Sequence, residues 1–200
     1  MTVRSATPGD DAAVDRVVRA AFDDEGDQVA AIWAELGPLG HLRASLVAVV
    51  GAVDGADGGA DAVVGHVGLS RAWVDARRAL VEVLVLSPLS VLPEHQGRGH
   101  GTALVAAAVD TARAAGTPVL LLEGSPTYYG ARGFTPAALH GLLPASVRVP
   151  AAAFQAVFLD GWESWMAGRL VYPDVWWRHE GVGLRDPLLA ELEGLFGRSS

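Results

Sequence analysis

The order strand, glycine-rich loop, helix, strand in the middle of the chain constrains its fold more than any other feature. Residues 80–92 form an apolar, β-branched run that is typical of a strand. Residues 97–115 follow as a helix opened by glycines, and residues 119–122 form a short apolar run typical of a buried parallel strand. Parallel connections of this kind are almost always right-handed, so the segment predicts a βαβ unit within an α/β domain.

Two short helices and a pair of strands are expected before this unit. Thr7 is an N-cap candidate, with a proline at the first helical position and Asp10 three residues on. Apolar residues with helical spacing follow in two groups, Val14, Val17, Val18, Ala21 and Phe22, then Val29, Ile32, Trp33 and Leu36. Residues 45–53 and 62–74 are β-branched runs joined by the glycine- and aspartate-rich residues 54–61, which predicts antiparallel neighbours.

The second half of the chain gives weaker signals. Pro88 cannot donate a ladder hydrogen bond, so it predicts a bulge, an edge or a local separation of strands. Residues 126–132 suit a short helix, and residues 147–159 suit at least one further strand. Four tryptophans, Trp162, Trp165, Trp176 and Trp177, fall in the last forty residues, where they either pack the tail onto the core or form a binding surface. No repeat or linker separates a second domain.

Composition excludes several chemistries. The chain has no cysteine, and all 15 of its positively charged residues are arginines, which excludes disulfides, thiolate metal sites, cysteine nucleophiles and lysine Schiff bases. A net charge of −8 disfavours nucleic acid as a partner and favours a cationic or neutral one. Apolar runs fall short of the roughly 20 residues of a membrane span. Acidic residues stand where a signal peptide needs its apolar core, so we expect a cytoplasmic protein.

The loop before the central helix is the segment most suited to binding a ligand. Gly97, Gly99 and Gly101 let backbone N–H groups approach a ligand closely, and the helix N-terminus adds free donors, so the loop suits a phosphate or pyrophosphate. It is neither a Walker A loop, which needs a lysine, nor a GxGxxG nucleotide motif. The alternative is that these glycines only allow the helix to pack tightly on the sheet.

Two motifs in order resemble the GNAT N-acetyltransferases. The coenzyme-A signature of that family, Gln/Arg-x-x-Gly-x-Gly/Ala, matches Gln96, Gly99 and Gly101. Residues 128–134 (YYGARGF) then resemble its Tyr-x-x-x-Gly-Phe element, with Tyr129 as the tyrosine. Together with the sequence VYP at 171–173, the pattern is most similar to the YhbS-like branch. The resemblance covers residues 2–175, so we expect an acetyltransferase domain over 1–175 and a tryptophan-containing extension over 176–200 packed on or near it.

The resemblance implies a mixed central β-sheet flanked by helices, in which parallel strands 4 and 5 splay apart and admit the pantetheine arm of acetyl-CoA. Pro88 fits such a splay. Backbone groups of Leu89, Ser90 and Val91 would bind the pantetheine and thioester. The residues implied to hold the pyrophosphate are Gln96, Gly97, Arg98, Gly99, His100, Gly101 and Thr102. Arg98 either adds a charge-assisted contact to a phosphate or is an exposed loop arginine.

The implied reaction is direct attack of a primary amine on the thioester, in a ternary complex without a covalent enzyme intermediate. Tyr129 is the candidate general acid, because a phenol with a pKa of about 10 is protonated at neutral pH and can donate to the sulfur of coenzyme A. The alternative is an aromatic packing role. A backbone N–H near Leu89 or Ser90 would polarise the thioester carbonyl.

The general base is left open between Glu82, Glu123, His66 and a water relay. An alkylamine with a pKa of about 10.4 must lose a proton before it attacks. For each side chain the structural alternative is a strand-end charge in solvent, or a hydrogen-bonded core histidine. His95 and His100 have no surrounding ligand pattern, so no metal is expected.

The expected acceptor is the amine of a small molecule or peptide, which the sequence does not identify. A non-catalytic acetyl-CoA sensor or scaffold remains the alternative function, with the tryptophan-rich tail engaging a partner. No nucleic acid and no membrane are expected as partners. A homodimer and a monomer both remain open, because the pair Trp176-Trp177 would suit either an interface or an exposed patch.

Overall fold

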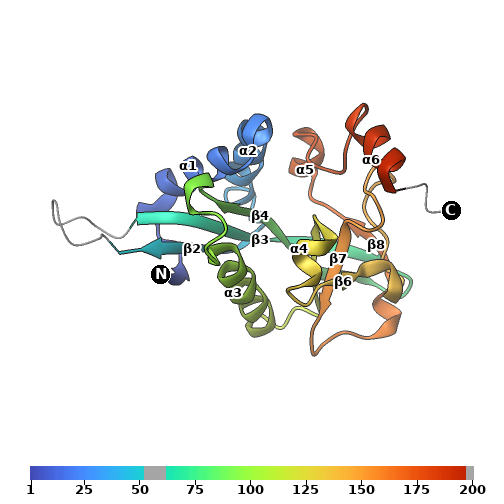
Figure 1. Ribbon diagram of the computed structural model, residues 1–200. Coiled ribbons are helices and arrows are strands. Elements are labelled where there is room, and N and C mark those ends of the chain that lie inside the picture. The colour runs from blue at the N-terminus through green and yellow to red at the C-terminus, as the bar shows by residue number, and fades with distance from the viewer. Residues whose placement is uncertain (52–61, 197–200) are drawn as a thin grey trace. The chain divides into compact units, whose positions relative to one another are not determined.

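The computed structural model describes residues 1–51 and 62–196 and has an α/β fold (Figure 1). Its strands are β1 (Thr2–Ser5), β2 (Leu42–Val50), β3 (Ala62–Ala76), β4 (Leu80–Val91), β5 (Val119–Glu123), β6 (Thr135–Pro136), β7 (Phe154–Phe158) and β8 (Gly168–Val171). Its α-helices are α1 (Asp11–Ala21), α2 (Gly26–Leu36), α3 (His100–Ala114), α4 (Pro126–Gly130), α5 (Asp174–Arg178) and α6 (Leu188–Phe196). Short 3-10 helices occupy Pro8–Asp10, Asp23–Glu25, Pro93–His95, Ala137–His140 and Ser164–Met166. The predicted hairpin connection, residues 54–61, lies outside the described residues.

The sheet is mixed, as expected. Its strands hydrogen-bond in the order β1-β2-β3-β4-β5-β7-β6, with β8 paired to β3. β4 and β5 are parallel, whereas β1–β2, β2–β3, β5–β7, β6–β7 and β3–β8 are antiparallel. The chain divides into two compact units: unit 1 comprises Met1–Ser70 and Leu86–Ala114, and unit 2 comprises Arg71–Val85 and Ala115–Ser200. β3 and β4 therefore each contribute residues to both units.

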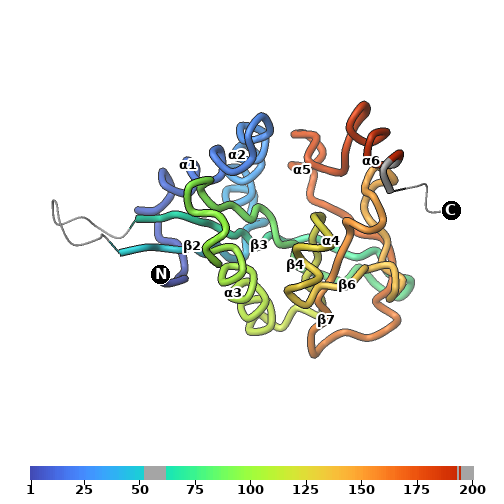
Figure 2. Tube along the Cα trace, viewed as in Figure 1, coloured from blue at the N-terminus to red at the C-terminus, as the bar shows by residue number. Residues whose placement is uncertain are grey.

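Unit 1 places helices on both faces of its part of the sheet. α1 and α2 lie on one face and α3 lies on the other (Figure 1). Val14, Val17 and Val18 of α1 form one apolar cluster with Val47 and Val49 of β2. The trace in Figure 2 leads from β4 through the glycine loop straight into α3, which is the strand–loop–helix order that the sequence predicts.

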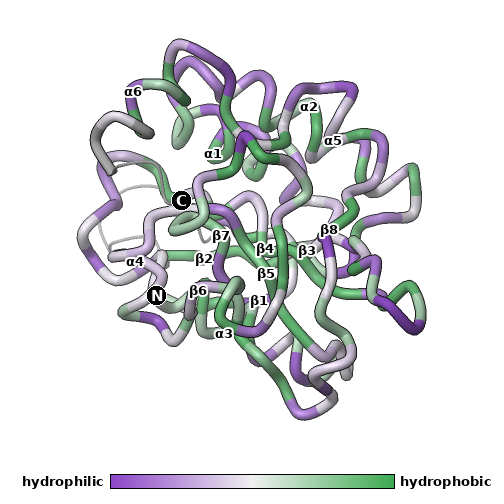
Figure 3. Tube along the Cα trace, turned by 90° about the vertical axis from the view of Figure 1, so that its right-hand side faces the viewer, coloured by the Kyte–Doolittle hydropathy of each residue, from purple (hydrophilic) through white to green (hydrophobic). Residues whose placement is uncertain are grey.

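Unit 2 is built around β5. Its residues Val119, Leu120, Leu121 and Leu122 are all buried, as a strand between two neighbours requires. β5 pairs in parallel with the first half of β4 and antiparallel with β7. In the hydropathy colouring of Figure 3, the central strands of the sheet are mostly hydrophobic. α4 begins directly after β5, at the motif that contains Tyr129.

The sequence predicts neither three short strands nor the last two helices, α5 and α6. β1, β6 and β8, of four, two and four residues, were not predicted. Within residues 147–159, only Phe154–Phe158 is a strand. Pro88 is buried inside β4, and the strand continues through it to Val91. Within the described part of the chain, no helix combines the length and the apolar character that crossing a bilayer needs.

Candidate active site

The glycine loop in unit 1 has an unusual backbone. Gly97 and Gly99 have φ angles of +72° and +87°, a left-handed region that residues with a Cβ rarely adopt. A Cβ built at either position would meet nothing within 4 Å, so tight packing does not explain these two glycines. α3 begins at His100, and its first N–H groups have no intrahelical acceptors. The loop therefore presents open space beside free donors, which suits an anionic group.

Side chains of the loop tie it to β4 and set its charge. Gln96 Nε2 donates to Val91 O at 3.1 Å, which connects the loop to the last residue of the strand. Arg98 is exposed. His100 is buried with its Nδ1 2.8 Å from Met1 Sδ. Burial, reinforced by the nearby charges of His95 and Arg98, lowers the pKa of His100, so Arg98 rather than His100 supplies the positive charge of the loop at neutral pH.

The predicted thioester-binding stretch is the last part of β4. Leu89 and Val91 are partly buried, whereas Ser90 is only 1% exposed. Its Oγ forms no hydrogen bond with any described residue. Leu92 N donates to Val64 O at 2.9 Å, so the strand is held by β3 up to the point where the loop begins. The implied splay of β4 from β5 involves both units and stays a prediction. Within unit 2 the parallel ladder pairs Leu84 with Leu120 and Val85 with Leu121.

Tyr129 lies in unit 2 on α4, directly after β5. Ser125 caps this helix, and its Oγ accepts from Tyr128 N at 3.3 Å. The ring of Tyr129 packs over Gly124, where a Cβ would lie 2.5 Å from Cε2, and meets Phe134 edge-on. Burial raises the pKa of Tyr129 well above its usual value, so the phenol stays protonated. A protonated phenol can donate a hydrogen bond.

Glu123 is the last residue of β5, and Gly124, over which the ring of Tyr129 packs, follows it in the chain. Tyr172 OH donates to Glu123 Oε1 at 2.9 Å. Burial raises the pKa of Glu123, while the Tyr172 hydroxyl, the Gly183 N–H and the charge of Arg148 oppose the rise. A carboxyl whose pKa is raised towards neutrality is suited to accept a proton at neutral pH. The contact with Tyr172 was not foreseen from the sequence, because 49 residues separate the two.

The other two base candidates have different surroundings. Glu82 lies near the start of β4 in unit 2, half-exposed and 3.8 Å from Arg71 Nη1. His66 lies in unit 1 and is fully buried, with Nε2 3.0 Å from Ser45 Oγ and its ring against Trp33. Burial lowers the pKa of His66 to about 3, so it is neutral at physiological pH and a weak base. Glu123 and Tyr129 thus lie six residues apart in unit 2, at the end of β5 and on α4, whereas Glu82 lies near the start of β4 and His66 lies in unit 1.

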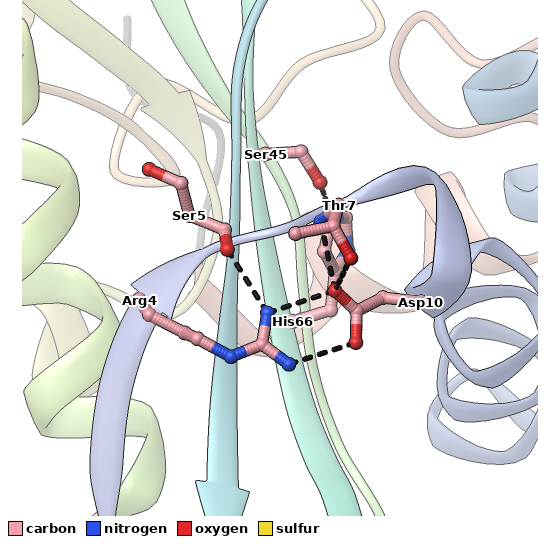
Figure 4. A network of polar contacts seen from close by, with 6 residues as sticks. All are labelled: Arg4, Ser5, Thr7, Asp10, Ser45 and His66. Carbon is pink, nitrogen blue, oxygen red and sulfur yellow. Dashed lines mark hydrogen bonds and ion pairs between the residues drawn. The ribbon is translucent and has the colours of Figure 1, made fainter.

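Figure 4 shows the polar contacts of Arg4, Thr7 and Asp10 in unit 1, with Ser45 and His66 behind them. Asp10 accepts from both terminal nitrogens of Arg4, at 2.8 and 2.9 Å, and from Thr7 N and Oγ. This is the capping box that the sequence predicts at Thr7. These hydrogen bonds hold the pKa of Asp10 well below its usual range, and the bond from Arg4 has the largest effect. The network fixes the start of the first helix.

A cavity of about 460 Å³ lies in the same unit. Its lining residues are Ala6, Thr7, Pro8, Asp11, Val14, Asp15, Ala30, Trp33, Ala34, Gly37, Leu42 and Ser45. Asp15 is paired with Arg19 at 2.8 Å, whereas Asp11 has no ion pair among the described residues. A mostly apolar hollow of this size with one free carboxylate suits a small molecule that carries a positive charge.

Comparison with known proteins gives consistent matches. A model of the acetyltransferase (GNAT) family matches residues 14–138. The uncharacterized N-acetyltransferase YjhQ of Escherichia coli (strain K12) is 33% identical over 87 residues, which are 44% of this chain and 48% of that protein. The matched region thus spans about half the length of that relative.

Two solved structures extend the likeness over most of the chain. The GNAT family N-acetyltransferase YhbS from Escherichia coli, in complex with CoA, has a TM-score of 0.74 and 26% identity, covering 92% of this chain and 95% of that one. A GNAT family acetyltransferase from Brucella melitensis, in complex with acetyl-CoA, has a TM-score of 0.66 and 26% identity, covering 88% and 97%.

Proposed function

Because this chain belongs to the acetyltransferase (GNAT) family, we propose that it transfers the acetyl group of acetyl-CoA to a primary amine of a small molecule or peptide. The observation that carries the proposal is the loop of unit 1, where two left-handed glycines stand beside open space at the start of α3. Solved relatives of the same fold hold CoA or acetyl-CoA. Acetyl-CoA supplies the acetyl group in activated form, as a thioester.

The loop and the end of β4 hold the cofactor in this proposal. Backbone N–H groups from Gly97 to Thr102 bind the pyrophosphate, and Arg98 adds a charge-assisted contact. Backbone groups of Leu89, Ser90 and Val91 bind the pantetheine arm, and an N–H near Leu89 or Ser90 polarises the thioester carbonyl. Only backbone atoms and one arginine are needed, which fits a loop with glycine at every second position from Gly97 to Gly101.

Glu123 and Tyr129 perform the two proton transfers. Glu123 takes a proton from the ammonium form of the acceptor, which frees the nitrogen lone pair for attack on the carbonyl carbon. Tyr129 then supplies the proton that the departing thiolate takes up, and the second proton that the nitrogen loses as the tetrahedral intermediate collapses restores the phenol. The amine attacks directly, so no covalent enzyme intermediate is formed. Glu123 is favoured over Glu82 and His66 because its burial raises its pKa, whereas Glu82 is half-exposed and burial makes His66 a weaker base.

The acceptor is proposed to be small and cationic. The chain carries a net charge of −8, which favours approach of a cation. The cavity between α1, α2 and β2 offers apolar walls, the ring of Trp33 and the carboxylate of Asp11. An ammonium near an aromatic face and a carboxylate is bound by cation–π and charge interactions.

Calorimetry with acetyl-CoA, with desulfo-coenzyme A as the control for the thiol, tests the cofactor site. The matched variants are Gly99→Glu and Gly116→Glu, because both replace a left-handed, exposed glycine with open space around it. They differ in position, since Gly116 follows the far end of α3. We expect Gly99→Glu to weaken acetyl-CoA binding at least about tenfold through charge repulsion, and Gly116→Glu to leave it unchanged.

Equal affinities in the two variants would refute the loop assignment. A screen of amines for release of coenzyme A then tests the reaction itself. Release with at least one amine supports the transferase. Tight binding without release across a broad panel would favour the non-catalytic acetyl-CoA-binding protein instead.

A further inference from the structure

We propose that Tyr172 is a positioning residue for Glu123, and that it keeps this carboxyl oriented and ionised so that Glu123 can act as the base. The inference rests on the proposed role of Glu123 and deepens it. It assigns a function to the VYP segment at the end of β8 and to the tail beyond it. All the groups involved belong to unit 2.

The position of the Tyr172 hydroxyl is set by the fold around it. β8 pairs antiparallel with β3, with Val171 opposite Trp73, and Tyr172 is the next residue after the strand. Its side chain is buried, and its ring packs on that of Trp176 with the centroids 4.9 Å apart. The hydroxyl therefore has little freedom to leave Glu123 Oε1, 2.9 Å away.

Tyr172 can only act as the donor in this bond. Burial, together with the charge of Glu123, raises the pKa of Tyr172 well above its usual value, so the phenol keeps its proton throughout the working range. Glu123 must then accept at Oε1, and its carboxylate form accepts more strongly than its neutral form. A hydrogen bond of this kind to an ionised acceptor is stronger than one between neutral groups.

Among the described residues, two charged or titratable side chains act on the carboxyl of Glu123. Tyr172 comes from the segment after β8, and Arg148 from the loop before β7. The loop after α5 contributes the Gly183 backbone N–H, and β7 places the apolar Phe154 opposite Glu123. Burial favours the neutral acid of Glu123. The Tyr172 hydroxyl, the Gly183 N–H and the charge of Arg148 favour the carboxylate. Loss of the Tyr172 hydroxyl would thus shift the balance towards the protonated form.

The substitution Tyr172→Phe tests this directly, because it removes the hydroxyl and keeps the ring against Trp176. We expect the acid limb of the pH profile of kcat to move to higher pH by about one unit, the size of one hydrogen bond. At a pH on that limb, kcat falls about tenfold, and the KM for acetyl-CoA stays unchanged. In a Glu123→Gln background, Tyr172→Phe should have little further effect on kcat, because the two residues act through one group.

The ionisation of Glu123 can also be followed without turnover, by titrating 13C-labelled glutamate carboxyls in the full-length protein. The Glu123 signal is assigned by its loss in Glu123→Gln. Its pKa should rise by about one unit in Tyr172→Phe. Trp176→Phe is the control, because it alters the packing of the same ring and keeps the hydroxyl, so the Glu123 titration should stay in place.

The outcomes separate this inference from the proposed function. An unshifted Glu123 titration in a folded Tyr172→Phe protein overturns the positioning role. An equal shift in Trp176→Phe overturns it as well, because packing alone would then explain the effect. If no amine is acetylated, the transferase proposal fails, while the carboxyl titration still decides whether Tyr172 controls Glu123. If Tyr172→Phe shifts the titration of the Glu123 carboxyl but leaves the acid limb of the kcat profile in place, Glu123 is not the base that this limb reports, and the link to catalysis is refuted.

Discussion

At the scale of single residues, burial has opposite consequences for the two most buried base candidates. It raises the pKa of Glu123, because the charged form of an acid is disfavoured in an apolar environment, and it lowers the pKa of His66 to about 3 for the same reason. Glu123 is thereby made a better base near neutrality and His66 a poorer one. The sequence offers both as candidates, because nothing local to either residue reports how deeply it is buried.

Tyr129→Phe is the direct test of the general acid. Without the hydroxyl, the departing thiolate has no positioned proton donor, so kcat should fall by about 10²-fold. The ring stays over Gly124 and against Phe134, so the dissociation constant for acetyl-CoA should stay within a factor of two of that of the wild type, roughly 0.4 kcal/mol. Steady-state kinetics and calorimetry measure the two quantities. Wild-type kcat in the variant would remove Tyr129 from the mechanism.

At the scale of elements, the capping box before α1 links a local sequence pattern to stability. Asp10→Ala removes the acceptor for Arg4, Thr7 N and Thr7 Oγ, and should lower the free energy of unfolding by roughly 1–2 kcal/mol at pH 7. Asp11→Ala is the control, since the exposed carboxyl of Asp11 makes no hydrogen bond within the described residues. Urea unfolding of both variants measures the difference, and equal losses would contradict the capping role.

The same cap predicts a dependence on pH with a definite sign. The folded-state pKa of Asp10 is lowered, so its contribution to stability is complete above the unfolded value of about 3.9 and is lost as pH falls towards the folded value. The gap in stability between the wild type and Asp10→Ala should therefore be constant from pH 7 to about 5 and shrink below about 4. A gap that grows on acidification would refute this assignment.

Elements with strong local patterns could be predicted, and elements that depend on distant partners could not. The order β4, glycine loop, α3, β5 follows from β-branched runs and glycines that are adjacent in the chain. β8 carries no such pattern in its four residues and exists because it pairs with β3. The candidate site divides in the same way: the motifs around Gly99 and Tyr129 are local, whereas the contact between Tyr172 and Glu123 spans 49 residues.

At the scale of the whole molecule, the tail predicted to lie outside the family domain contributes to unit 2. α5 begins at Asp174, before the expected boundary at 175, and buries Val175 and Trp176. The loop after it supplies the N–H of Gly183 to Glu123 and hydrogen-bonds to Arg148 through Leu184. The division of the chain at 175 and the oligomeric state both stay predictions.

Two adjacent tryptophans test how far the tail belongs to the fold. Trp176 is 6% exposed and Trp177 is 44% exposed. Trp176→Ala should cost roughly 3–5 kcal/mol, which lowers the Tm by about 10 °C in a chain of this length. Trp177→Ala should change the Tm by no more than about 2 °C. Thermal unfolding of the two variants gives the comparison, and similar losses would mean that the tail is not specifically packed.

The left-handed glycines of the loop have a consequence in terms of chirality. Their backbone angles are the mirror image of those that L-residues prefer, and both face open space. A residue of the D configuration would adopt the φ angle at 97 or 99 without strain. Among the genetically encoded amino acids only glycine is achiral. Glycine is therefore the translated residue that adopts these φ angles at positions 97 and 99 without strain.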